Sequence, residues 1–134
     1  MAKVLVIDDE REAREALRTF LDLAGYDVYQ ARDGEEGLIR YDESSPDVVV
    51  TDILMPNKEG LETIRELKER HPDARVIACT GGGRLPHLSG ELLDYAEILG
   101  ADHVMEKPVN PNALLGMVKD LLERAIRLPA MAAP

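Results

Sequence analysis

The sequence is poor in cysteine, in basic residues and in long apolar runs, and each shortage excludes a class of protein. Its single cysteine, Cys79, cannot form an internal disulfide, so the chain is not a small disulfide-stapled domain. Lys and Arg number 16 against 26 Asp and Glu, and the formal net charge of −10 argues against direct binding to nucleic acid. No apolar stretch reaches membrane-spanning length, and the N-terminus lacks the apolar core of a signal peptide. We therefore expect a soluble, cytoplasmic protein with no direct nucleic-acid or membrane partner.

The length and composition fit a single domain. The chain has 134 residues, of which 45% are hydrophobic, and a domain of that size buries roughly two-thirds of its unfolded surface. Neither an internal repeat nor a linker divides it. We expect one domain over residues 1–127 and a flexible tail over residues 128–134, where no helical period is visible. Cys79 lies inside an apolar run, which predicts a buried and unreactive thiol.

Five short apolar runs alternate with five helical patterns. The runs lie at residues 3–7, 26–29, 48–51, 76–79 and 103–106. The helices are expected after Asp9, over 34–41, 58–70 and 90–99, and from Pro111. Asp33 and Asn110 are the expected caps of the second and fifth helices, and Leu38 and Ile39 are expected to face the core. Such an alternation predicts an α/β fold with a parallel sheet covered on both faces.

Four of the five apolar runs end in polar residues that suit phosphate chemistry. The first leads into Asp8 and Asp9, the third into Asp52, the fourth into Thr80 and the fifth into Lys107. In an open parallel sheet, ligands bind beyond the carboxyl ends of the strands. We therefore expect these five side chains to meet in one crevice.

Asp52 is the candidate nucleophile. A carboxylate can attack a phosphoryl group and hold it as an acyl phosphate, although an isolated aspartate at a strand end more simply caps a turn. Two unit charges about 4 Å apart repel by roughly 4 kcal/mol at an effective dielectric near 20. Asp8 and Asp9 beside Asp52 therefore call for a cation, and hard oxygen ligands suit Mg²⁺. Either of the pair could instead cap the first helix, but capping does not require two acids.

Lys107 and Thr80 complete the candidate site. An ammonium group can contact a phosphoryl oxygen, or it can pair with Asp52 in the absence of phosphate. The hydroxyl of Thr80 can donate to another phosphoryl oxygen. Taken singly, each would be an ordinary solvated lysine or strand-end threonine. With a metal ion on the other side, they form a cradle that stabilises a transferring phosphoryl group.

With these residues in this order, the chain resembles the response-regulator receiver domains, the phosphoacceptor modules of two-component signalling. The resemblance covers residues 4 to about 126. Its markers are Asp8-Asp9, Asp52-Ile53-Leu54-Met55-Pro56 with Gly60, Thr80, Gly100-Ala101-Asp102 and Lys107-Pro108. It implies a flavodoxin-like, doubly wound, five-stranded parallel sheet of order 2-1-3-4-5 with five helices.

The resemblance also implies a role for each site residue. Asp52 would be phosphorylated by a histidine kinase or a histidine phosphotransfer protein, with Thr80 and Lys107 assisting the transfer. The ligands of Mg²⁺ would be Asp8, Asp9, Asp52 and the backbone carbonyl of Leu54. The Lys107–Pro108 peptide bond would be cis. Phosphorylation would then shift the surface of the fourth helix, fifth strand and fifth helix, which controls a downstream protein or a fused effector domain. Beyond gaining and losing its own phosphate, the domain would not be an enzyme.

Two features depart from the receiver pattern. Receivers usually carry Tyr or Phe three residues before the lysine, where this chain has Val104. A small β-branched side chain excludes the usual aromatic rotamer change, so Thr80 and Val104 would form an altered switch. The connection over residues 81–90 is also long and glycine-rich. We expect it to be mobile without phosphate and to become ordered around Thr80 when Asp52 is modified.

Two other functions stay open from the residues alone. A phosphorylation-independent pseudo-receiver would only bind partners; Val104 favours it, and the complete set of five site residues counts against it. An aspartate-nucleophile phosphohydrolase of the haloacid dehalogenase type is the second. Those enzymes use two aspartates spaced by one residue on one strand end, whereas Asp8 and Asp9 are adjacent and Asp52 lies elsewhere.

Overall fold

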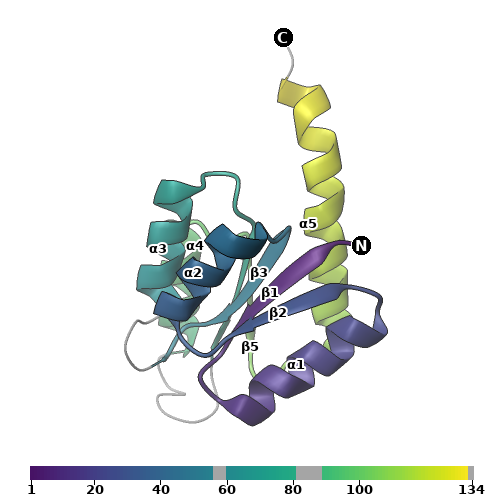
Figure 1. Ribbon diagram of the computed structural model, residues 1–134. Coiled ribbons are helices and arrows are strands. Elements are labelled where there is room, and N and C mark those ends of the chain that lie inside the picture. Colours follow the sequence, from purple (N-terminus) through teal and green to yellow (C-terminus); the bar gives the residue numbers. More distant parts are fainter. Residues whose placement is uncertain (56–59, 81–88, 133–134) are drawn as a thin grey trace.

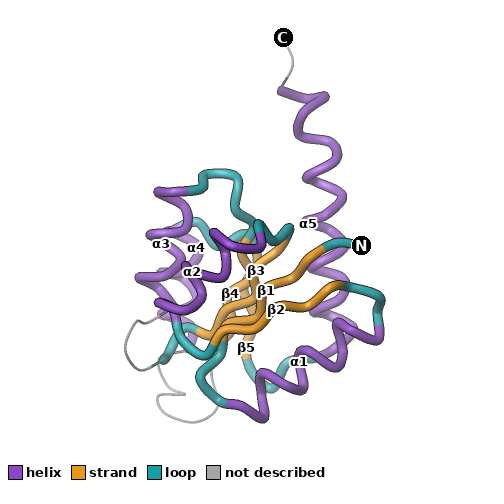
Figure 2. The backbone as a smooth tube through the Cα atoms, in the orientation of Figure 1, coloured by secondary structure: helices purple, strands orange, loops and turns teal. Residues whose placement is uncertain are grey.

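The computed structural model describes residues 1–55, 60–80 and 89–132 and contains a five-stranded parallel sheet between two layers of helices (Figures 1 and 2). The strands are β1 (Lys3–Ile7), β2 (Asp27–Ala31), β3 (Val48–Asp52), β4 (Val76–Thr80) and β5 (His103–Glu106). They pair in the order β2-β1-β3-β4-β5, and every pair is parallel. The predicted flavodoxin-like fold and strand order are confirmed.

The helices divide between the two faces of the sheet. They are α1 (Arg11–Leu23), α2 (Gly34–Ser44), α3 (Gly60–Arg70), α4 (Ser89–Leu99) and α5 (Pro111–Ala132). Helices α1 and α5 cover one face, and α2, α3 and α4 cover the other (Figure 1). Along β1, Val4 and Val6 pack towards α1 and α5, whereas Leu5 and Ile7 pack towards α2 and α3. Because successive side chains of a strand point to opposite faces, a continuous aliphatic run fills both cores.

The predicted helix caps are present. The Asp33 side chain accepts a hydrogen bond from the Glu36 amide at the start of α2, and Asn110 Oδ1 accepts one from the Ala113 amide at the start of α5. Helix α1 differs, because Glu10 at its N-cap makes no side-chain cap bond. Neither acid of the Asp8–Asp9 pair therefore occupies the cap position of this helix.

The expectation that Ile39 faces the core is wrong, since its side chain is 55% exposed. The buried face of α2 is instead formed by Gly34, Gly37 and Leu38. Gly37 lies so close to β1 that an added Cβ would be 2.4 Å from Ile7 Cδ1. The helix approaches the sheet along its glycines, and this turns Ile39 towards solvent.

Some boundaries differ from the sequence predictions. Helix α2 continues to Ser44, and helix α5 continues to Ala132, so residues 128–132 have helical backbone where a tail was expected. Leucine, alanine and methionine in that segment favour helix, whereas Pro129 opposes it. The last turns of α5 project beyond the sheet in Figure 1. The domain boundary at residue 127 and the flexibility of the tail stay predictions. The expected start of the third helix at residue 58 and the proposed ordering of the 81–90 connection, up to residue 88, lie outside the described residues. Among the helices that are described, none is long and apolar enough to span a bilayer.

Candidate functional site

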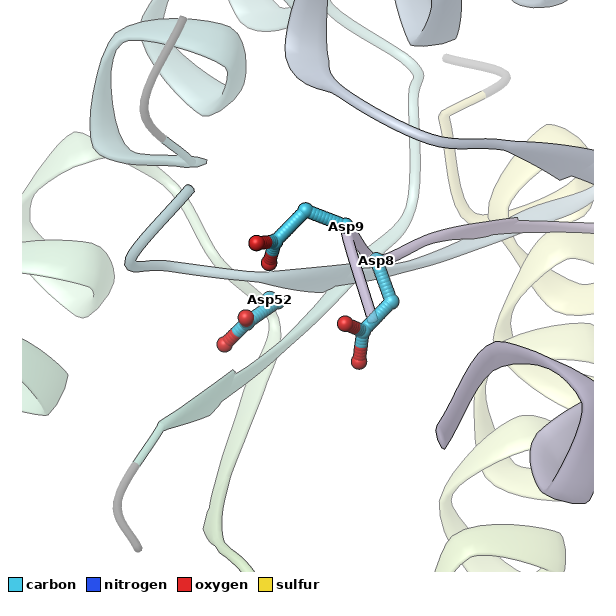
Figure 3. Close-up of side chains that lie close together, drawn as sticks. All are labelled: Asp8, Asp9 and Asp52. Atoms are coloured by element: carbon cyan, nitrogen blue, oxygen red, sulfur yellow. The ribbon is translucent and has the colours of Figure 1, made fainter. Parts of the chain in front are cut away.

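Three carboxylates meet at the carboxyl edge of the sheet, and we call Asp8, Asp9 and Asp52 the acidic cluster. Strands β1 and β3 are parallel neighbours with Ile7 opposite Thr51, so the residues that follow lie beside one another. One carboxylate oxygen from each acid lies within 4.8 Å of the others, and Figure 3 shows the three side chains grouped together. Asp8 and Asp52 are both buried. Their close approach is unfavourable unless a cation balances it.

The environment of Asp52 opposes its negative charge. Burial raises the pKa of Asp52 to about 6, and the charges of Asp8 and Asp9 add to this effect. Lys107 and the backbone N–H of Ile53, which donates to Asp52 Oδ1 at 2.9 Å, lower the pKa in part. A cation bound at the acidic cluster would favour the ionised form of Asp52, which is also its nucleophilic form.

Lys107 contacts two of the three acids. Its Nζ lies 2.9 Å from Asp8 Oδ2 and 3.6 Å from Asp52 Oδ2. The sequence interpretation paired Lys107 with Asp52, whereas the nearer partner is Asp8. Burial lowers the pKa of Lys107, but the hydrogen bond to Asp8 and the charges of both acids outweigh it, so that the pKa is raised overall. The lysine therefore stays protonated and is shared between the strand ends of β1 and β3.

The connection after β5 is anchored to the end of β4. The Lys107 backbone N–H donates to the Thr80 carbonyl at 2.7 Å, and the Lys107–Pro108 peptide bond is cis, as predicted. Thr80 itself is 1% exposed, and its hydroxyl has no hydrogen-bond partner among the described residues. A buried hydroxyl without a partner costs about 1–3 kcal/mol. It is the group expected at a site whose hydrogen-bond acceptor arrives with a ligand.

The donor set fits Mg²⁺. Three carboxylates at one edge supply the hard oxygen ligands that this ion prefers. Leu54 is partly buried and follows Asp52 by two residues, and the role of its carbonyl rests on the receiver resemblance. Val104 lies opposite Ala78 in the β4–β5 register and packs against the core beneath α2, α3 and α4. Cys79 is buried as expected, and burial raises its pKa to about 12.

Arg14 is a site neighbour that the sequence interpretation missed. Its Nη1 donates to the backbone carbonyl of Asp8 at 2.8 Å. From the sequence it is one of several charged residues on an amphipathic helix, and nothing in its spacing points to a backbone contact. The geometry of the loop between β1 and α1 was needed to identify it.

An apolar cavity of about 270 Å³ opens beside the site, between α1 and the connection from β5 to α5. Its apolar lining consists of Ala13, Ala16, Leu17, Phe20, Pro108 and Val109. Asp8 and Lys107 line it as well. The cavity therefore joins an apolar surface to the charged groups of the site.

Comparisons with known proteins agree with this geometry. Residues 4–119 match the family described as response regulator receiver domain. Transcriptional regulatory protein CpxR of Klebsiella pneumoniae is 34% identical over 125 residues, which are 93% of this chain and 51% of CpxR. Response regulator MprA of Mycolicibacterium vanbaalenii is 35% identical over 122 residues, which are 91% of this chain and 51% of MprA. The chain thus spans about half the length of these curated relatives.

Solved structures show the same similarity. A response regulator receiver domain protein from Clostridium thermocellum has a TM-score of 0.87 at 33% identity, covering 96% of this chain and 99% of that one. The chemotaxis protein CheY4 of Vibrio cholerae has a TM-score of 0.79 at 28% identity, covering 90% of this chain and 98% of CheY4. Both proteins match nearly their whole length to this chain.

Proposed function

Because this chain belongs to the response regulator receiver domain family, we propose that it accepts a phosphoryl group on Asp52. The donor is the phosphohistidine of a histidine kinase or a histidine phosphotransfer protein, met in the cytoplasm. One observation carries the proposal: Asp52 shares the acidic cluster with Asp8 and Asp9 while Lys107 Nζ lies 3.6 Å from its carboxylate. A nucleophile, a cation site and a fixed ammonium group are what phosphoryl transfer requires.

The transfer forms one bond and breaks one. An Asp52 carboxylate oxygen attacks phosphorus, the P–N bond of the phosphohistidine breaks, and the bonding electrons stay with the imidazole. Mg²⁺, held by Asp8, Asp9, Asp52 and the Leu54 carbonyl, would neutralise charge on the phosphoryl oxygens. Lys107 contacts a second phosphoryl oxygen, since its Nζ already lies between Asp8 and Asp52. The Thr80 hydroxyl, which has no partner among the residues that the structure describes, donates to a third.

The signal leaves the site through the elements that carry Thr80 and Lys107. Thr80 ends β4 and is followed in the chain by α4, and Lys107 joins β5 to α5. A change at either residue therefore reaches the surface formed by α4, β5 and α5. On α4, Tyr95 is 58% and Ile98 78% exposed, so this surface offers apolar contacts to a downstream protein or a fused effector domain. With Val104 in place of an aromatic residue, the shift relies on Thr80 and on repacking of a small side chain.

A mass measurement tests the proposal. Incubation with acetyl phosphate and Mg²⁺ is expected to add one phosphoryl mass to the wild type and none to Asp52→Asn. Asp94→Asn, an exposed substitution on α4, is the matched control and is expected to be modified like the wild type. Phosphate release without an adduct would instead indicate a phosphohydrolase. The absence of both an adduct and phosphate release would indicate a pseudo-receiver.

The apolar cavity beside the site leads to a second prediction. Ala16 is exposed and lines this cavity, and a charge placed there would meet the apolar side chain that a protein donor inserts. Ala16→Glu is expected to slow transfer from a phosphohistidine protein about tenfold, equivalent to about 1.4 kcal/mol. Reaction with acetyl phosphate should not change, because a small donor does not need the cavity.

Thr19→Glu is the control for that experiment. It adds the same charge at an exposed position of α1 that does not line the cavity. Transfer rates are measured with any phosphohistidine protein that phosphorylates the wild type. Equal slowing by both substitutions would show that helix charge matters and the cavity does not.

A further inference from the structure

We propose that Arg14 is a positioning residue, which fixes the acidic cluster by holding the peptide unit that joins Asp8 to Asp9. The Mg²⁺-binding test of this proposal rests on the proposed function. The hydrogen bonds around Asp8 do not depend on it. Arg14 lies in the first turns of α1 and is partly buried. Its Nη1 donates to the Asp8 carbonyl at 2.8 Å.

That carbonyl determines where Asp9 lies. A peptide unit is planar, so the direction of the Asp8 C=O bond fixes the direction of the chain from Asp8 to the Cα of Asp9. The preceding peptide is already held, because the Asp8 N–H donates to the Ala31 carbonyl at the end of β2 at 3.1 Å. Beyond this point β1 has ended, and the strand ladder no longer restrains the backbone. Arg14 supplies the next restraint.

The loop between β1 and α1 is short. It consists of residues 8–10, and Glu10 at the N-cap of α1 makes no side-chain cap bond. Asp8 Oδ1 accepts the Glu10 N–H at 2.9 Å, and the Arg14 N–H donates to the Glu10 carbonyl at 2.9 Å. The Arg14 side chain therefore closes a ring of hydrogen bonds around Asp8 and Glu10. With it, the two acids are presented at a fixed separation before any cation binds.

Preorganisation of this kind affects affinity for a cation. Mg²⁺ demands near-ideal ligand geometry, and a loop that must be ordered on binding lowers affinity by the free energy of ordering. Arg14 suits the task because its planar guanidinium donates in a fixed direction, whereas a lysine ammonium on a flexible stem does so less well. An Arg14→Lys substitution should therefore keep part of the contribution of Arg14 to cation affinity, and Arg14→Met should keep none of it.

The first test uses the metal-free protein. Hydrogen exchange of the Glu10 amide reports on the loop, because that amide is bonded to Asp8 Oδ1. In Arg14→Met its exchange is expected to be about tenfold faster than in the wild type. Arg18→Met is the matched control: Arg18 is exposed, lies one turn further along α1, and makes no hydrogen bond or ion pair with the described residues 1–55, 60–80 and 89–132. It should leave the exchange of the Glu10 amide unchanged.

The second test measures Mg²⁺ binding by titration calorimetry, which suits a chain without tryptophan. Arg14→Met is expected to raise the Kd for Mg²⁺ five- to tenfold at unchanged helix content, Arg14→Lys about two- to threefold, and Arg18→Met not at all. A Kd and a Glu10 exchange rate within twofold of the wild type in Arg14→Met would overturn the role of Arg14. If the wild type binds no Mg²⁺ and takes no phosphate, the proposed function fails, and Glu10 exchange alone decides the positioning.

Discussion

Asp52→Asn is expected to stabilise the metal-free protein by about 3 kcal/mol above pH 7 and to have little effect below about pH 4. Burial raises the pKa of Asp52 from 3.8 to about 6 in the folded protein. The folded state therefore binds a proton more tightly than the unfolded state, and stability falls as the pH rises between these two values. Each unit of pKa difference corresponds to about 1.4 kcal/mol. Asparagine resembles the protonated carboxyl group and removes this loss.

Urea unfolding at a series of pH values, with a chelator present, measures the effect. Asp52 Oδ1 accepts the Ile53 N–H, and the asparagine oxygen can keep this bond, so the comparison isolates charge. Asp94→Asn, at an exposed position on α4, is the control for removing one negative charge away from the acidic cluster. A stability difference that is constant from pH 4 to pH 8 would contradict the prediction.

Magnesium supplies an independent check of the same argument. A cation that binds the folded protein stabilises it by mass action, and the acidic cluster is its expected site. Added Mg²⁺ should therefore stabilise the wild type more than Asp52→Asn, and the advantage of the substitution should shrink. Equal stabilisation of both proteins would place the ion elsewhere.

The strands and their order could be predicted because two features of the sequence agree: the apolar runs and the polar residues that follow them. The runs at residues 3–7 and 103–106 match β1 and β5 residue for residue. For β1 the reason is that aliphatic residues buried on both faces leave little freedom in their placement. Convergence of the polar residues followed from topology alone, because parallel strands end at one edge. The close grouping of Asp8, Asp9 and Asp52 needed no information beyond this.

What the sequence did not determine depends on packing between elements. Ile39 was expected inside because it is apolar, but Gly37 sets the closest approach of α2 to β1 and turns Ile39 outwards. Hydrophobic periodicity cannot predict the buried face of a helix when glycines form that face. The preference of Lys107 for Asp8 over Asp52 depends on a difference between 2.9 and 3.6 Å. A distance of that size is set by side-chain rotamers and by the path of the connection after β5, which no residue pattern specifies.

Gly60→Ala is expected to destabilise the protein by at least about 3 kcal/mol. This is the upper end of the usual free-energy cost of adding a group to a well-packed core. A Cβ at this position would lie 2.1 Å from the Asp52 carbonyl oxygen and 2.6 Å from Ile53 Cα. Both contacts are to backbone, so no side-chain rotation relieves them. The backbone is also held in place, because the Ile53 N–H donates to the Cys79 carbonyl and the Gly60 N–H to the Ile53 carbonyl. Relief therefore requires α3 to move away from the strand end that carries Asp52.

Two other glycines provide graded controls in the same urea unfolding experiment. In Gly37→Ala the new methyl group would lie 2.4 Å from Ile7 Cδ1, the end of a side chain that can rotate, so a loss of about 1–2 kcal/mol is expected. Gly116 is exposed on α5 with nothing within 4 Å of the added Cβ, and Gly116→Ala should gain about 0.5–1 kcal/mol. If Gly60→Ala loses no more than Gly37→Ala, the packing of α3 against the backbone of Asp52 is looser than the structure indicates. In that case, the start of α3 would not be what holds Asp52 in place.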